Sequence, residues 1–321
     1  MRRLLPLTLA LAIAIPALAA EDTIRRGFNV TDGGTLSLTA GIGNVTVVSG
    51  GSGVAIEIVR ESHGRRGEEQ MREHSIDIRQ SGNDVIIDGE LDRGNSWFRM
   101  WDSDDYEVKW NIRVPARYNV DLSTSGGSIN LADMGGTVEA RTSGGGIKTG
   151  KLGGTANLRT SGGSVTVAGG SGNVNAHTSG GSIEIGDTTG EVEAKTSGGG
   201  IRLGRVGGDV LARTSGGSIR IDDATGAVDA STSGGSITAT LSRQPRGDSK
   251  LSTSGGGVTV SLASGISVDV DAKASGGGVR SDVPVTVQGT QDDGELQGRI
   301  GSGGPKLVLR TSGGGIRLKS L

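Results

Sequence analysis

The tetrapeptide Thr-Ser-Gly-Gly recurs along this chain at a fixed spacing of 18 residues, and no other feature constrains the fold as strongly. A repeat this short cannot bury its own apolar residues, so consecutive repeats must stack to form one continuous core. Beyond residue 241 insertions stretch the spacing, and one later copy reads Ala-Ser-Gly-Gly. The strictly spaced copies begin at Thr124, Thr142, Thr160, Thr178, Thr196, Thr214 and Thr232, and the later ones at Thr253, Ala274 and Thr311.

Each repeat divides into two halves of nine residues, and each half predicts one β-strand and one turn. Gly recurs every nine residues from Gly127 to Gly235, and the residues two and four positions after it are mostly Ile, Val, Leu or Ala. Mostly polar residues separate them, which is the alternation of a strand with one buried face. The glycines are expected to allow sharp turns with positive φ and a close approach of neighbouring turns.

Composition favours a thin repetitive core over a single large one. Aromatic residues are only 2% of the chain and hydrophobic residues 33%, whereas Gly accounts for 60 of 321 residues. The formal net charge of −2 lacks the high-charge signature of disorder. We therefore predict an all-β fold, a parallel two-faced β-solenoid with 18-residue coils, over residues 121–321. Its period is strict over 124–241 and looser towards the C-terminus, and the Thr of each copy is expected to turn inward.

The two segments before the solenoid have different characters. Residues 1–19 read as a signal peptide, with Arg2 and Arg3, an apolar run and an Ala17-Leu18-Ala19 cleavage site. Cleavage after Ala19 predicts a periplasmic or secreted protein, and no later segment is apolar enough to span a membrane. Residues 20–120 are rich in strand-like segments without a strict period, with one short helix expected from Arg65 to His74. We predict an irregular β cap there, which shields the open edge of the first coil.

These features together resemble the bacterial putative-adhesin family of extracytoplasmic β-strand-repeat proteins, also described as head-GIN-like and as a domain of unknown function. The resemblance covers essentially the whole mature chain. It implies the repeat architecture and an extracytoplasmic location, and it transfers no catalytic residue. Besides the repeats, it rests on Gly41-Ile42-Gly43-Asn44-Val45, on Val114-Pro115, and on Gly301-Ser302-Gly303-Gly304 before Leu307.

A column of basic residues is the first candidate site. By strand alternation the residue before each Thr-Ser-Gly-Gly copy points outward, so these side chains should stack coil upon coil. We consider two interpretations, a shallow basic stripe for an anionic glycan or lipid headgroup and an ordinary solvated face. Acidic residues such as Glu139, Glu193 and Asp229 are expected to offset the like charges only in part. The column comprises Arg141, Arg159, His177, Lys195 and Arg213.

A group of aromatic residues beside an acidic stretch is the second candidate site. Six of the seven aromatics lie between Trp97 and Tyr118, around the carboxylates of residues 102–107. Such a group could bind a sugar or a cation, or it could form the hydrophobic core of the cap with its acids facing water. The aromatics concerned are Trp97, Trp101, Tyr106 and Trp110.

No catalytic, metal-binding or cofactor-binding residue can be assigned. The repeat has apolar residues where a calcium-binding nonapeptide repeat has its ligand Asp, and the chain contains no Cys. We therefore predict a non-catalytic exported envelope protein that presents a rigid repetitive β surface, with an anionic glycan or another envelope component as ligand. The alternatives are an envelope-stress or regulatory accessory that binds an envelope protein, and a carbohydrate-active β-helix enzyme. No nucleic-acid partner is expected.

Overall fold

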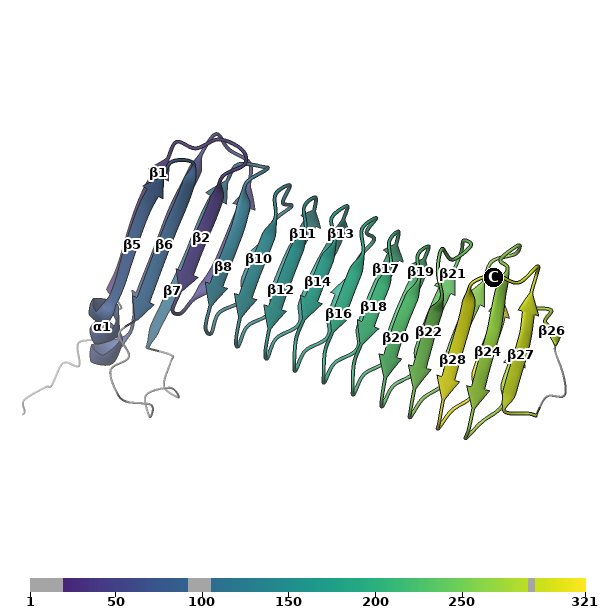
Figure 1. Ribbon diagram of the computed structural model, residues 1–321. Coiled ribbons are helices and arrows are strands. Elements are labelled where there is room, and N and C mark those ends of the chain that lie inside the picture. The colour runs from purple at the N-terminus through teal and green to yellow at the C-terminus, as the bar shows by residue number, and fades with distance from the viewer. Residues whose placement is uncertain (1–19, 92–104, 288–291) are drawn as a thin grey trace, which may run out of the picture.

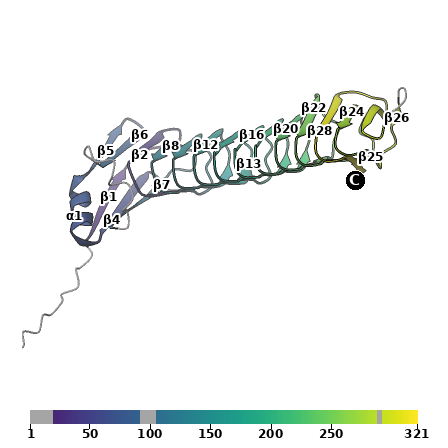
Figure 2. The same ribbon diagram turned by 90° about the horizontal axis from the view of Figure 1, so that it is seen from below.

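The computed structural model describes residues 20–91, 105–287 and 292–321, so the predicted signal peptide lies outside the described residues. Two long sheets face each other along an elongated body, and their strands run across its length (Figures 1 and 2). We call the 14-stranded sheet, which contains β9 and β11, sheet A, and the 15-stranded sheet, which contains β8 and β10, sheet B. The predicted all-β, two-faced solenoid is confirmed.

The central coils alternate regularly between the two sheets. Each coil contributes one strand to sheet B and the next to sheet A, and every strand pairs in parallel with its equivalent 18 residues away; Val138 pairs with Ala156, and Ala156 with Val174. The inward residues of these strands form the core, and Ile183 and Ile185 are 1% and 0% exposed. The strands are β8 (Asn119–Thr124), β9 (Ile129–Leu131), β10 (Val138–Thr142), β11 (Ile147–Leu152), β12 (Ala156–Thr160), β13 (Val165–Gly170), β14 (Val174–His177), β15 (Ile183–Ile185), β16 (Val192–Lys195), β17 (Ile201–Val206), β18 (Val210–Arg213), β19 (Ile219–Ala224), β20 (Val228–Thr232), β21 (Ile237–Leu241), β22 (Ser249–Thr253) and β23 (Val258–Leu262).

The phased glycines are required because consecutive turns touch backbone to backbone. A Cβ atom on Gly163 would lie 2.2 Å from the carbonyl oxygen of Gly145, and one on Gly181 would lie 2.2 Å from that of Gly163. Neither Gly163 nor Gly181 is among the glycines with positive φ. The expectation of positive φ at these turns is therefore wrong, and close approach alone excludes a side chain.

The Thr of each copy turns inward, as expected, and bonds to the preceding coil. Thr178 is 0% exposed, and its hydroxyl donates to the carbonyl oxygen of Gly163 at 2.7 Å. The same oxygen accepts a hydrogen bond from the backbone N–H of Gly181 at 3.3 Å. Thr160 and Thr196 repeat the contact one coil away on either side, at 2.7 Å each. A column of buried hydroxyls therefore joins successive turns.

Replacing one of these hydroxyls should destabilise the solenoid. We expect Thr178→Val to lower the free energy of unfolding by about 1–3 kcal/mol, because it keeps the side-chain shape but leaves the Gly163 carbonyl unpaired. Urea unfolding measures the change. Ser179→Ala, at the neighbouring exposed position, is the control and should change stability by less than about 0.5 kcal/mol. Equal stability of Thr178→Val and the parent chain would contradict the role assigned to this column.

At the N-terminal end the coils are not stacked in chain order. Strands β2 and β3 lie between β6 and β7 on one side and β8 and β9 on the other, all in parallel register. Antiparallel strands then close this end, β4 and β1 in sheet A and β5 in sheet B (Figure 1). The helix predicted near residues 65–74 is confirmed. These elements are β1 (Ala20–Phe28), β2 (Thr35–Ala40), β3 (Asn44–Ser49), β4 (Val54–Ser62), α1 (Gly64–Glu73), β5 (His74–Ser81), β6 (Asp84–Leu91) and β7 (Tyr106–Val114).

The C-terminal end shows the same departure from chain order. The last coil, β28 and β29, lies between the coil of β22 and β23 and the coil of β24 and β25. Thr311 of this last coil donates to the carbonyl oxygen of Gly256 at 2.6 Å, so an out-of-order coil makes the contact of the regular ones. The elements are β24 (Val268–Ala274), β25 (Val279–Ser281), β26 (Thr286–Val287), β27 (Glu295–Ile300), β28 (Lys306–Thr311) and β29 (Ile316–Ser320).

Candidate functional site

The predicted basic residues lie side by side on the outer face of sheet B. Consecutive strands β10, β12, β14, β16 and β18 each contribute one of them, and the register pairs each residue directly with the next. All five lie at outward positions, and four of them are exposed while Lys195 is half-buried. The order along the sheet is Arg141, Arg159, His177, Lys195 and Arg213.

Acidic side chains on the same strands neutralise most of this basic column. Arg141 forms ion pairs with Glu139 and, at 3.4 Å, with Asp121. Lys195 pairs with Glu193 two residues before it. At the far end Arg213 lies 3.0 Å from Asp229. The offset by acids is therefore more complete than the sequence suggested, because acids on adjacent strands contribute as well as those on the same strand.

The neutralisation is interrupted in the middle of the column. There the acidic positions are occupied by Asn157 and Asn175, which pair in register with each other, beside Arg159 and His177. Arg159 is 3.6 Å from its nearest carboxylate, on Glu139, and His177 forms no ion pair or side-chain hydrogen bond within the described chain. We call Asn157, Arg159, Asn175 and His177 the central polar patch. It presents amide, guanidinium and imidazole groups to solvent on two adjacent strands.

The aromatic candidate site has a different structure from the one considered for ligand binding. Trp97 and Trp101 lie outside the described residues. Tyr106 and Trp110 point into the core and are 6% and 0% exposed, and the Trp110 indole N–H donates to the carbonyl oxygen of Ile42 at 2.9 Å. These two rings therefore stabilise the cap and are not presented to a ligand as a stacking surface.

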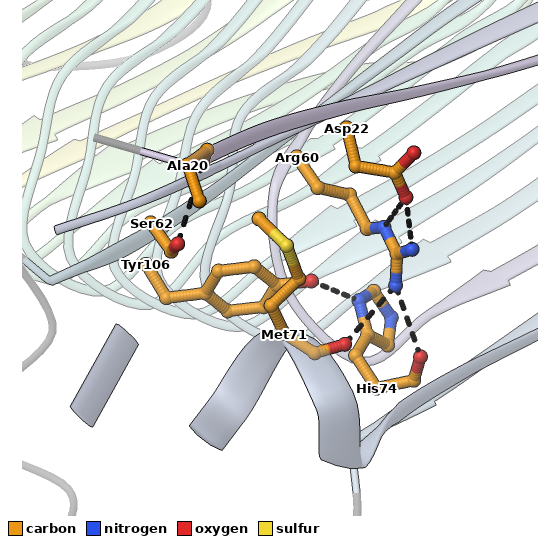
Figure 3. Close-up of polar contacts among 7 residues, drawn as sticks. All are labelled: Ala20, Asp22, Arg60, Ser62, Met71, His74 and Tyr106. Atoms are coloured by element: carbon orange, nitrogen blue, oxygen red, sulfur yellow. Dashed lines mark hydrogen bonds and ion pairs between the residues drawn. The ribbon is translucent and has the colours of Figure 1, made fainter. Parts of the chain in front are cut away.

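Tyr106 belongs instead to a buried polar network at the N-terminal end (Figure 3). Its hydroxyl lies 2.8 Å from Nδ1 of His74, whose ring is 3% exposed and packs edge-on against Tyr106 and Trp110. Arg60 forms an ion pair with Asp22 and donates to the backbone carbonyl oxygens of Met71 and His74 at 3.1 and 3.3 Å. The network thereby ties β1, β4, α1 and β5 together. Sequence reasoning missed it, because Asp22, Arg60 and His74 are far apart in an irregular segment.

Burial makes this network sensitive to acid. It lowers the pKa of His74 from 6.5 to about 4, and the nearby positive charge of Arg60 adds to the effect. Burial also raises the pKa of Tyr106 to about 12. The unfolded chain takes up a proton at His74 as the pH falls below about 6.5, whereas the folded chain resists it until about pH 4. Stability is therefore complete above pH 6.5 and declines as the pH falls towards 4.

We expect this decline to disappear in a His74→Gln variant. Between pH 7.5 and 4.5 the parent chain should lose up to about 3 kcal/mol of stability at the cap through this one group. Thermal unfolding at the two pH values, followed by the fluorescence of the buried Trp110, measures it. His63→Gln, at an exposed position before α1, is the control and should keep the pH dependence of the parent chain. The same pH dependence in His74→Gln and the parent would contradict the assignment.

An open depression of about 700 Å³ lies beside this network, at the ends of β2, β5 and β6. Its lining combines the carboxylates of Glu73 and Glu90 with the hydroxyls of Thr39, Ser75 and Ser125. Within the described ranges there is no group of three or more His, Cys, Asp or Glu residues that could hold a metal ion. The depression offers hydrogen-bonding groups, and no nucleophile–base pair converges in it.

Comparison with known proteins identifies the family. The family model for Toastrack DUF4097, a domain of unknown function, matches residues 35–319. The chain belongs to the Toastrack family. The predicted membership of a β-repeat family of unknown function is confirmed, and no curated protein sequence matches the chain. Among the described helices, none is long and apolar enough to cross a membrane.

Several solved structures share features of this Toastrack chain. One is a putative adhesin from Bacteroides fragilis, with 11% identity, a TM-score of 0.34, and coverage of 94% of this chain and 97% of that one. A putative lipid binding protein from Parabacteroides distasonis has the same identity and coverage and a TM-score of 0.35. A putative cell adhesion protein from Clostridium sporogenes has 11% identity, a TM-score of 0.23, and coverage of 94% and 100%. These are loose similarities of fold.

Proposed function

We propose that this Toastrack protein is a non-catalytic, exported envelope protein whose sheet B face binds an anionic glycan at the central polar patch. The observation that favours this function is the interrupted acidic column beside Arg159 and His177. Everywhere else in the basic column of sheet B the cations have close acidic partners, whereas here a guanidinium, an imidazole and two amides face solvent together. Export rests on the predicted signal peptide of residues 1–19, with a periplasmic or secreted destination.

The chemistry of the patch suits an acidic sugar. A guanidinium can form two parallel hydrogen bonds to a carboxylate or sulfate, and the amides of Asn157 and Asn175 can both donate to and accept from sugar hydroxyls. The two strands are hydrogen-bonded in a stack of coils, so the four side chains extend from a rigid surface and lose little backbone entropy on binding. Exposed ion pairs contribute little to stability, so the basic column itself does not require a structural explanation.

A glycan-binding screen with paired variants tests this function. We expect the mature protein to bind an anionic polysaccharide with an affinity that falls as salt is raised from low to moderate concentration. The double variant Arg159→Gln with His177→Gln should weaken binding about tenfold, the equivalent of about 1.4 kcal/mol. The matched double variant Arg141→Gln with Arg213→Gln removes cations that already pair with acids, and it should change affinity by less than about threefold.

The outcomes separate the alternatives for this face. Equal effects of the two double variants would contradict a site at the central polar patch. Absence of binding to any anionic polysaccharide would overturn the proposed ligand and favour the alternative of an envelope protein as partner. Turnover of a polysaccharide would contradict the non-catalytic assignment.

A further inference from the structure

The opposite face of the solenoid, the outer face of sheet A, gathers basic residues towards its C-terminal end. Strands lie there in the order β17, β19, β21, β23, β29 and β25. Basic side chains occupy outward positions at the two flanks of this region, and the two strands between them present only hydroxyl groups at their outward positions. We call the five basic residues and the four hydroxyl residues the sheet A patch. They are Arg202, Arg220, Thr238, Thr240, Thr259, Ser261, Arg317, Lys319 and Arg280.

Acids do not neutralise this patch as they do the column on sheet B. On one flank Arg202 and Arg220 share a single carboxylate, that of Asp222, at 3.6 and 2.7 Å. On the other flank Arg317 is 3.6 Å from Asp282. Five basic side chains thus face two acidic ones, and they remain in excess when the terminal carboxylate of Leu321 is counted, in a chain whose formal net charge is −2.

Two members of the patch have no acidic partner at all. Arg280 and Lys319 form no ion pair with any described residue. The nearby segment 288–291, which is not described, contains no acidic residue that could pair with them. Arg280 also pairs in register with Arg317, so two guanidinium groups extend from neighbouring strands about 4.8 Å apart. Like charges placed directly opposite are destabilising, and the fold offers no compensating contact for them.

We propose that the sheet A patch is a second binding site, which holds a linear anionic polysaccharide lying across the strands. Acidic groups of the polymer contact Arg220 on one flank and Arg280, Arg317 and Lys319 on the other. Three strand spacings, about 14 Å, separate Arg220 from Arg317, so one chain must span them with more than one acidic group. The site uses the ligand class of the proposed function on the other face, and it does not depend on the central polar patch.

The residues between the two flanks favour a polysaccharide over a lipid surface. Thr238, Thr240, Thr259 and Ser261 are half-buried, and their hydroxyls can exchange hydrogen bonds with the hydroxyls of a sugar chain. A bilayer is bound by apolar side chains that enter it together with cations that contact its headgroups, and these four positions offer no large apolar side chain. Binding to anionic vesicles is therefore an outcome that would contradict the proposal.

Binding measurements on two triple variants, each lacking three cations, test the site. The probes are dextran sulfate, polygalacturonate and vesicles that contain phosphatidylglycerol, each titrated by calorimetry at low and at moderate salt. The variant Arg280→Gln, Arg317→Gln and Lys319→Gln should bind at least one of the two polysaccharides about tenfold more weakly than the parent. All three side chains are exposed, so the variant should fold, and circular dichroism with thermal unfolding verifies this. The single variant Lys319→Gln should show a smaller loss in the same direction.

The matched control is the variant Arg141→Gln, Arg159→Gln and Arg213→Gln on the opposite face, which removes the same number of cations. A loss of binding confined to the sheet A triple variant, or a loss that is additive between the two triple variants, supports the second site. A loss confined to the control variant overturns the second site and leaves the proposed function standing. Equal losses without additivity, or binding to vesicles but to neither polysaccharide, also overturn it.

Discussion

The close contact between consecutive turns is the constraint on which the rest of the structure depends. Each turn presents a glycine with no room for a Cβ atom, and the buried Thr beside it donates to a carbonyl oxygen of the coil before, as Thr178 does to Gly163. The contact leaves only one register in which a coil of 18 residues can stack, because a shift of one residue would turn every apolar side chain outward. The core, with the inward pairs such as Ile183 and Ile185, follows from that register.

The same register determines what the surface can do. Residues at equivalent positions of successive coils form straight columns, so the charge of a face depends on which residue types occupy two or three positions of the repeat. On sheet B, Glu139, Glu193 and Asp229 lie beside the cations of their column. On the outer face of sheet A, Asp222 and Asp282 serve five cations. One architecture thus provides a nearly neutral face with a single interruption and a second face with an excess of positive charge.

The regular part of the fold could be predicted from the sequence because the contact recurs at a constant spacing. Strand positions, the inward Thr and the outward basic column all follow from the 18-residue period and strand alternation. The order of the coils at the two ends could not be predicted, since the copies at Thr253 and Thr311 look alike although the coil of Ala274 comes between them in the chain. The one available signal was that Ala274 lacks the hydroxyl of the other copies, which suits an outermost coil.

The candidate sites were harder to predict than the fold. The sequence placed Arg141 and its equivalents in one column, but their ion pairs depend on side chains of adjacent strands, such as Asp121 beside Arg141. The patch on sheet A was missed because Arg280 and Arg317 become neighbours only through the out-of-order insertion of β29. Tyr106 and Trp110 were assigned to a candidate ligand site or a core, and in an irregular segment no period could distinguish the two possibilities.

Deletion of whole and of partial coils tests the central role of the 18-residue register most directly. Removal of residues 160–195 takes out two coils and joins Arg159 to Thr196 at equivalent positions of the repeat. We predict that this variant folds cooperatively with an unchanged β-sheet circular dichroism spectrum, and that small-angle scattering shows a body shorter by about 10 Å. Removal of residues 160–186 takes out one and a half coils, forces strands of one sheet into the other, and should abolish cooperative folding. A folded product of the second deletion, or a misfolded product of the first, would contradict the account.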